Sequence, residues 1–286
     1  MSIRDRHPVE PWAFVEEGVD LDRLAQTESL FALSNGHIGL RGNLDEGEPA
    51  GLTGTYLNGF YESFPLEYGE RGYGFAEDGQ SVVNVTDGKI IRLQVEDEPL
   101  DVHRGEVLQH ERRLDFRSGQ LERKLHWRAA SGHEVRLTTK RLVSLSLRSL
   151  AAIHYEVEAV DQPIRIAIQS NLQANRADAH EGPDPRRGRA LGDALRSRLS
   201  VDHGMRVVLG HETGRSGLAV VSGMAHVIFH DGEVATLTQS EPDLGRVTLS
   251  AELEPGRPLT LVKFIAYHWS SQQSIDWLRD QVDASL

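Results

Sequence analysis

The sequence alternates between apolar and polar residues in Leu121-Glu122-Arg123-Lys124-Leu125-His126-Trp127, and again in Val135-Arg136-Leu137-Thr138-Thr139. Successive side chains of a β-strand point to opposite faces, so this period of two predicts strands with one buried face. In the first run, the residues that share a face are Leu121, Arg123, Leu125 and Trp127. Between the two runs lies Ala130-Ser131-Gly132-His133, which is typical of a hairpin turn. The two strands are therefore predicted to be antiparallel neighbours.

Similar short runs recur along most of the chain. Each is rich in β-branched or apolar residues and is separated from the next by Gly, Asp, Pro or Ser. They lie at 82–85, 90–95, 150–159, 164–170, 205–210, 217–222, 225–230, 246–253 and 259–267. Many short strands at such spacing predict an all-β fold, built as a large antiparallel β-sandwich.

The last residues break this pattern. Ile275, Leu278 and Val282 fall on one stripe of a helix, and Ser274 precedes them as a candidate N-cap. We therefore expect residues 1–270 to form the sandwich and residues 271–286 to begin a helical linker. Because the chain reaches Leu286 without a terminating signal, we expect a further domain to follow.

Composition narrows the possible functions. The chain of 286 residues has a net charge of −12, which argues against nucleic acid as a partner because phosphate binding relies on clustered basic residues. It has no cysteine, which excludes a disulfide framework, a thiol nucleophile and cysteine metal ligands. The polar start from Met1 to Glu10 is not that of a signal peptide, and no apolar run reaches the ~20 residues of a membrane helix. We expect a cytoplasmic protein without a membrane partner.

A search for catalytic motifs is negative. The sequence has no Walker phosphate-binding loop, no nucleophile elbow, no HExxH and no dinucleotide fingerprint. The 13 histidines are scattered without a pair at ligand spacing, so no metal site is predicted. The charged run His110-Glu111-Arg112-Arg113-Leu114-Asp115 is interpreted as a solvated strand face. The polar segment 174–200 is interpreted as a solvated loop, although it also holds an alternative metal-ligating set: Asp178, His180, Glu181 and Asp184.

The first 65 residues carry a more specific pattern. Three closely spaced glycines, Gly36, Gly39 and Gly42, lie in Glu28-Ser29-Leu30-Phe31-Ala32-Leu33-Ser34-Asn35-Gly36-His37-Ile38-Gly39-Leu40-Arg41-Gly42-Asn43. A short apolar strand precedes them, and glycine permits a positive φ or a close backbone approach, which predicts a tight turn with a bulge. This run resembles the signature ETLFSLGNGYLGLRG near the start of the family 65 glycoside hydrolases, which include maltose, trehalose and kojibiose phosphorylases.

Four later segments resemble the same family in the same order. The first is Thr55-Tyr56-Leu57-Asn58-Gly59-Phe60-Tyr61-Glu62, which is similar to the family's GTYINGFYE, and the others lie at 82–85, 107–115 and 140–145. The segment at 82–85 departs from the family, because Thr86 and Asp87 follow it in place of Pro-Asn. Five ordered matches are far more specific than any one of them.

The resemblance implies a super-sandwich of the galactose-mutarotase-like type, followed by a helical linker, an (α/α)6 catalytic barrel and a small sheet domain. In this family the barrel supplies a glutamate acid, and phosphate, or a base-activated water in the hydrolases, attacks the anomeric carbon with inversion. No barrel residue can be placed on this chain. The resemblance therefore implies no catalytic residue and no cofactor here, and an isolated domain without activity.

The resemblance also implies a substrate and partners for the full-length enzyme. The expected substrate is an α-glucosidic disaccharide of the trehalose, maltose or kojibiose type, with inorganic phosphate as co-substrate if the enzyme is a phosphorylase. The expected protein partners are the chain's own catalytic barrel and a second copy, which would make the full-length enzyme a homodimer.

Within the chain, segment 58–75 is the candidate functional loop. It is rich in glycine and aromatic residues and too long for a simple hairpin. We therefore take Asn58, Tyr61 and Glu62 as substrate-binding candidates that wall the active site of the barrel or of a dimer partner. Two alternatives stay open. The same aromatic residues suit a stand-alone carbohydrate-binding sandwich, since sugars stack on rings. A mutarotase-like epimerase would need an acid and a base at one anomeric centre, and no His and Glu are placed for this.

Overall fold

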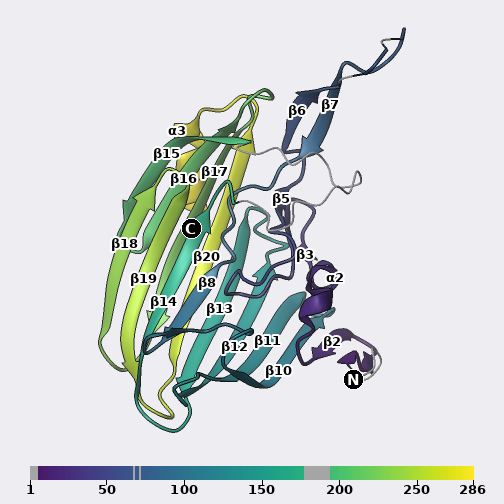
Figure 1. Cartoon of the computed structure of the whole chain (residues 1–286). Coiled ribbons are helices and arrows are strands. Elements are labelled where there is room, and N and C mark those ends of the chain that lie inside the picture. Colours follow the sequence, from purple (N-terminus) through teal and green to yellow (C-terminus); the bar gives the residue numbers. More distant parts are fainter. Residues whose placement is uncertain (1–5, 67, 71, 177–193) are drawn as a thin grey trace.

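The computed structural model describes residues 6–66, 68–70, 72–176 and 194–286, and it confirms the antiparallel β-sandwich (Figure 1). The larger sheet of the described residues has ten strands. In spatial order they are β1 (Val9–Glu10), β2 (Ala13–Glu17), β10 (Glu106–Asp115), β11 (Gln120–Arg128), β12 (Glu134–Val143), β13 (Leu150–Ala159), β20 (Leu259–Ser270), β17 (Ala219–Phe229), β16 (Arg206–Thr213) and β15 (Leu195–His203).

A second sheet of five strands packs against the inner face of the larger one. Its order is β18 (Val234–Glu241), β19 (Leu244–Leu253), β14 (Ile164–Gln173), β8 (Ile91–Val95) and β9 (Glu98–Pro99). Two small sheets complete the strands: β3 (Leu33–Ser34), β4 (Ile38–Leu40) and β5 (Thr55–Leu57) form one, and β6 (Tyr61–Pro65) and β7 (Asp78–Val82) form the other. Within the described ranges, the helices with assigned bounds are the 3-10 turn η1 (Leu21–Arg23), α2 (Leu24–Leu30) and α3 (Ile275–Ser285).

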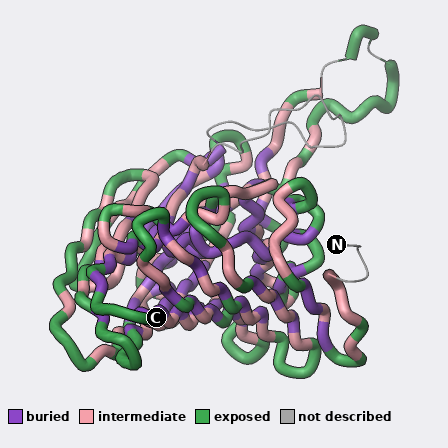
Figure 2. Tube along the Cα trace, turned by 60° about the horizontal axis from the view of Figure 1, so that its bottom comes forward, coloured by how far each residue is buried: buried purple, intermediate pink, exposed green. Residues whose placement is uncertain are grey.

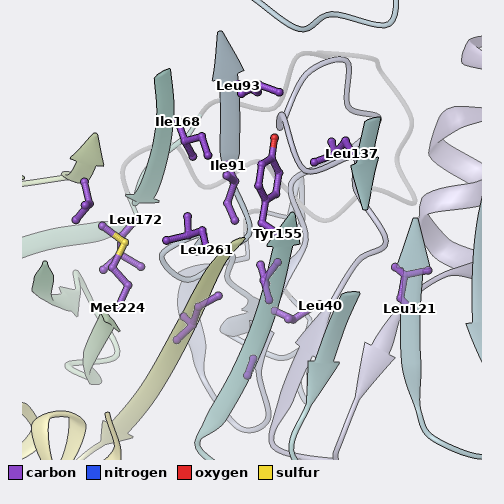
Figure 3. Close-up of a cluster of buried hydrophobic side chains, with 14 of the residues drawn as sticks. Leu40, Ile91, Leu93, Leu121, Leu137, Tyr155, Ile168, Leu172, Met224 and Leu261 are labelled. Carbon is purple, nitrogen blue, oxygen red and sulfur yellow. The ribbon is translucent and has the colours of Figure 1, made fainter. Parts of the chain in front are cut away.

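The core lies between the two sheets because the inner positions of their strands are mostly apolar. The predicted hairpin of β11 and β12 is present, with Leu125 opposite Leu137. Figure 3 shows the result: Leu121, Leu137 and Tyr155 of the large sheet lie in one cluster with Leu93 and Ile168 of the second sheet. The predicted strand at 82–85 is only partly correct, since β7 ends at Val82.

Helix α3 forms where the apolar stripe predicted it. Ser274 caps it, because its side-chain oxygen accepts a hydrogen bond from the backbone nitrogen of Trp277 at 3.2 Å. Leu278 and Val282 pack on the outer face of the large sheet, against a cluster that contains Val221. The division into a sandwich and a linker at residue 270 stays a prediction. No helix in the described ranges is long and apolar enough to cross a membrane.

Three segments differ from expectation or extend it. Helix α2 was not predicted. Its last residues, from Glu28 to Leu30, begin the glycine-rich signature, so the signature starts in a helix and not in a strand.

The interpretation of 174–200 as a loop is wrong at its end, because β15 begins at Leu195. The alternative metal-ligating set, Asp178, His180, Glu181 and Asp184, lies outside the described residues. Figure 2 shows the ribbon of β6 and β7 projecting from the sandwich body, with an exposed tip.

Candidate functional site

The signature crosses the inner face of the large sheet at a row of polar side chains. Glu16 on β2 is the register partner of Arg112 on β10, and Arg112 is the partner of Arg123 on β11. Arg123 in turn faces Thr139 on β12. All four side chains are buried, although their neighbours along each strand on the same face are largely apolar. Buried arginines require acidic partners, and the loop between β4 and β5 supplies them.

Asp45 and Glu46 of that loop bind the arginines directly. Arg123 donates from Nη1 and Nη2 to the two carboxylate oxygens of Glu46 at 2.8 and 3.0 Å, a bidentate pair. Arg141 donates from Nη2 to Asp45 Oδ1 at 2.7 Å, and Thr139 donates from Oγ1 to Asp45 Oδ2 at 2.9 Å. Each oxygen of the two carboxylates therefore accepts at least one hydrogen bond within the fold.

The electrostatics of this cluster favour the charged forms of Asp45 and Arg123. Burial alone raises the pKa of the Asp45 carboxyl, but Arg141 and Arg123 outweigh it and hold that pKa below its ordinary value. Burial opposes the charge of Arg123 as well, yet Glu46 and Asp45 raise its pKa. A buried network whose charges are paired is expensive to break, because removal of one partner leaves the other charge buried without compensation.

His110 is the neutral member of the cluster. Arg123 donates from Nε to His110 Nε2 at 3.1 Å, so that nitrogen must carry no proton. The remaining proton lies on Nδ1, which donates to the carbonyl oxygen of Gly18 at 2.9 Å. Burial and the adjacent guanidinium groups lower the pKa of His110 well below its ordinary value.

Arg112 ties the signature to the edge of the sheet. It donates from Nε to Glu16 Oε2 at 2.7 Å, from Nη2 to Thr27 Oγ1 at 2.8 Å and from Nη1 to the carbonyl oxygen of Gly42 at 3.0 Å. A Cβ atom at Gly42 would lie 2.4 Å from Phe31 Cβ, so only glycine allows this approach.

The other two signature glycines behave differently from Gly42. Gly36 has a φ of +81°, the left-handed region that glycine favours, and it forms the turn between β3 and β4. Gly39 lies within β4, where an added Cβ would meet nothing within 4 Å. The geometry thus explains glycine at positions 36 and 42 and gives no reason for it at 39.

The foot of the projecting hairpin is held by one carboxylate. Glu62 Oε1 accepts hydrogen bonds from the backbone nitrogens of Ser63 at 2.9 Å and Ser216 at 2.8 Å, and Oε2 accepts from Arg215 at 3.0 Å. Burial opposes ionisation, but these backbone donors hold the pKa of Glu62 below its ordinary value. Glu62 is buried and anchors β6 to the turn between β16 and β17.

The two other loop candidates lie beside this anchor. Asn58 donates from its backbone nitrogen to the carbonyl oxygen of His37 at 2.9 Å, and its side chain is exposed. Tyr61 is half-buried against the core, next to Phe60, whose ring meets Trp269 edge-on with centroids 5.9 Å apart. Of the three candidates, Asn58 is the one whose side chain is open to solvent.

Sequence reasoning missed the ion network. The interpretation of His110–Asp115 as a solvated face is wrong for His110 and Arg112, which are buried. The available signal was Arg123, which shares the apolar face of its strand and therefore needed a buried acid. Among the described residues, no group of three or more His, Asp or Glu residues is arranged to hold a metal ion.

These features agree with a known family. A profile described as glycosyl hydrolase family 65, N-terminal domain, matches residues 14–286. The chain belongs to glycosyl hydrolase family 65. It is 50% identical over 286 residues to an uncharacterised glycosyl hydrolase of Mycobacterium tuberculosis, covering 100% of this chain and 36% of that protein. It is 34% identical over 269 residues to an α,α-trehalose phosphorylase of Thermoanaerobacter brockii, covering 92% of this chain and 35% of that protein.

A solved structure has the same fold as this family 65 domain. It is described as a putative kojibiose phosphorylase from human microbiome, and it matches with a TM-score of 0.85 at 24% sequence identity. The match covers 98% of this chain and 36% of that one. The chain thus spans about a third of the length of the proteins it matches.

Proposed function

We propose that the complete protein cleaves an α-glucosidic disaccharide of the trehalose, maltose or kojibiose type by inverting phosphorolysis or hydrolysis, and that this chain is its non-catalytic N-terminal domain. The 34% identity to an α,α-trehalose phosphorylase supports this substrate class. A maltose phosphorylase of Bacillus subtilis is 29% identical over 171 residues, 59% of this chain, and widens the class beyond trehalose. The proposal places the catalytic glutamate in a barrel that follows this domain.

One observation supports a structural role for this domain and a catalytic role for the domain that we propose to follow it. Inverting cleavage of a glycosidic bond needs an acid that can give its proton to the sugar, held in a cleft that the sugar can enter. Asp45 and Glu46 are buried and bound by guanidinium groups, and Glu62 is buried and bound by backbone nitrogens. These carboxylates are committed to the fold, which supports a structural role for the domain.

The hairpin of β6 and β7 is the part of the domain that we propose to approach substrate. It projects from the body, and its tip exposes Tyr73 fully and Phe75 by 53%. Because Glu62 fixes its foot, the hairpin leaves the sandwich in a defined direction and can wall the sugar site of the barrel or of a dimer partner. Asn58, at that foot, is the candidate for a polar contact to sugar.

A second function is favoured by the same aromatic residues. In a stand-alone carbohydrate-binding domain, Tyr73 would provide the stacking surface, since its ring is free, whereas Tyr68 and Phe75 pack on each other with centroids 4.9 Å apart. Titration of the purified chain with maltose and trehalose distinguishes the two functions. Binding that Tyr73→Ala abolishes would favour the second function.

Activity assays test the main proposal. The chain of 286 residues and the complete enzyme are compared for sugar phosphate release from trehalose, maltose, kojibiose and nigerose with phosphate, and for glucose release without it. We expect turnover of one of these disaccharides by the complete enzyme and none by the chain alone. Turnover by the chain alone contradicts the proposal.

The hairpin is tested in the complete enzyme with Asn58→Ala, which leaves the Glu62 anchor in place. We expect a tenfold fall in kcat/KM, about 1.4 kcal/mol of transition-state stabilisation, without a change in melting temperature. Tyr61→Ala combined with Glu62→Ala should lower kcat/KM as well, but with a loss of stability because the anchor is removed. Wild-type kcat/KM in both variants would leave the hairpin without a role in catalysis.

A further inference from the structure

The turn between β12 and β13 presents two leucines to solvent. Leu145 is 80% exposed and Leu147 is 58% exposed, so the short turn at 144–149 presents two large apolar side chains to solvent. Arg148 follows them and is also exposed, and no carboxylate of the described residues is paired with it. The turn therefore offers an apolar contact next to an unpaired positive charge.

This turn is held rigid by the glycine-rich signature. The side-chain amide of Asn35 donates to the carbonyl oxygen of Ser144 at 2.6 Å and to that of Arg148 at 2.9 Å, one at each side of the leucines. The side-chain oxygen of the same Asn35 accepts from the backbone nitrogens of His37 and Ile38, both at 2.9 Å. Asn35 thus fixes its own turn and the leucine turn together, and a preorganised surface loses little entropy when it binds.

The last residues of helix α3 meet the same turn. Ser285 donates its hydroxyl proton to the carbonyl oxygen of Gln281 at 2.9 Å, so its oxygen is left to accept other hydrogen bonds. Its two remaining partners are His268 Nε2 at 2.9 Å and Ser149 Oγ at 3.3 Å. Ser149 follows Arg148 directly, and polypeptide that continues from α3 would therefore start beside the leucines.

We propose that the 144–149 turn is a docking site for the polypeptide that follows Leu286 in the complete enzyme. That polypeptide covers Leu145 and Leu147 with apolar side chains and pairs an acidic residue with Arg148. The relatives that match this chain are about three times its length, so in them a large segment is available to fill this role. This inference rests on the proposed function, because it requires a domain after α3.

The test compares the complete enzyme with the chain of 286 residues, each carrying Leu145→Ser and Leu147→Ser. We expect the substitutions to lower the melting temperature of the complete enzyme by about 3 °C or more and to leave that of the shorter chain unchanged. Arg148→Glu should have the same selectivity. The matched control is Leu237→Ser on β18, where a leucine is 59% exposed away from α3, and it should change neither protein.

Three results would overturn the inference. One is an equal effect of the leucine substitutions in both proteins, and another is no effect in either. The third is a dimer of the shorter chain that the substitutions dissociate, because the occupant is then a second copy. The readout is stability and not turnover. An inactive complete enzyme would therefore contradict the proposed function, but it would not decide whether the 144–149 turn is a docking site. A natural reading frame that stops at Leu286 would end both.

Discussion

Two regions of the inner face of the large sheet bury positive side chains in opposite ways. Over β10 to β12, Arg123 and Arg141 meet the carboxylates of Glu46 and Asp45 at 2.8 and 2.7 Å. On β20, Lys263 is fully buried, and within the described part of the chain it donates only to the carbonyl oxygens of Asn171 at 2.7 Å and Ile90 at 3.4 Å. Burial lowers the pKa of Lys263 to about 7. One region keeps its charges by pairing them, whereas in the other a lysine loses its charge as the pH rises above about 7.

The difference follows from the chemistry of the two side chains. A guanidinium group does not lose its proton in a protein, so a buried arginine has to be paired. A buried lysine can become neutral, and it then needs only polar contacts. The loop that follows the family signature brings Asp45 and Glu46 to the arginines, whereas Lys263 donates to carbonyl oxygens, so the two regions should respond differently to substitution and to pH.

Removing one arginine of the paired region should lower the free energy of unfolding more than any other substitution proposed for the sandwich. Arg123→Met leaves Glu46 and Asp45 buried with less compensation, and we expect the free energy of unfolding to fall by about 3–5 kcal/mol. Urea denaturation at pH 7 measures this loss. The control is Arg128→Met on the same strand, whose side chain is 40% exposed in its ion pairs and whose loss should cost about 1 kcal/mol or less. Similar losses in the two variants would mean that the network is not a buried, coupled unit.

The buried Lys263 should make the free energy of unfolding depend on pH in the alkaline range. Between pH 7 and the ordinary lysine pKa, Lys263 is neutral in the folded state and protonated in the unfolded state, so the unfolded state binds more protons. The free energy of unfolding therefore rises with pH, by about 2.5 kcal/mol from pH 7.5 to 9.5 for one such group.

Lys263→Met tests this assignment. The variant should lose that rise, which denaturant titrations at several pH values can follow. Lys89→Met is compared with Lys263→Met, because Lys89 donates to Asp87 at 2.8 Å. Its loss leaves the buried carboxylate of Asp87 without its positive partner. We expect it to be destabilising at every pH of the series. An identical pH slope in wild type and Lys263→Met would show that Lys263 keeps its charge.

The buried His226, which lies near Lys263, should make the free energy of unfolding depend on pH in the acidic range. His226 donates from Nδ1 to the carbonyl oxygen of Met205 and accepts from Ser170, each at 2.8 Å, and burial and Lys263 lower its pKa to about 3. Between pH 6.5 and 5 the unfolded state protonates this imidazole and the folded state does not, so stability falls as pH falls. We expect His226→Gln to remove about 1.5 kcal/mol of that decline. An unchanged slope below pH 6.5 would assign the decline to other histidines.

Much of the fold could be predicted from local patterns. Period-two alternation identified β11 and β12 with their turn, and one apolar stripe with Ser274 identified α3. These elements are encoded by neighbours in the sequence. Helix α2 was missed because its N-cap position, Arg23, makes no side-chain capping bond and so leaves no signal.

The candidate site was harder to predict because its contacts are long-range. Asp45 and Glu46 lie in a glycine-rich loop without any period, and their partners are 77 to 96 residues away in sequence. Strand order has the same difficulty, since nothing local indicates that Tyr155 faces Leu261 across β13 and β20. The signature marked the family correctly, but its residues serve pairing and packing that become visible only once the strands are aligned.

A further small effect should separate two neighbouring threonines on β12. Thr139 faces inward and donates to Asp45 at 2.9 Å, whereas Thr138 lies on the outer face and is partly exposed. Thr139→Val removes a hydrogen bond to a buried charge at nearly constant volume and should cost about 1–2 kcal/mol. Thr138→Val should stay within about 0.5 kcal/mol.

The pair also carries a pH signature. Thr139 helps to lower the pKa of Asp45, and a carboxyl with a lowered folded pKa contributes stability that is lost as pH falls through that value. Without this donor the folded pKa rises toward its ordinary value, so Thr139→Val should unfold at a higher pH on acidification than Thr138→Val. Equal acid midpoints, together with equal losses in urea, would show that Arg123 and Arg141 alone hold Asp45 in its charged state.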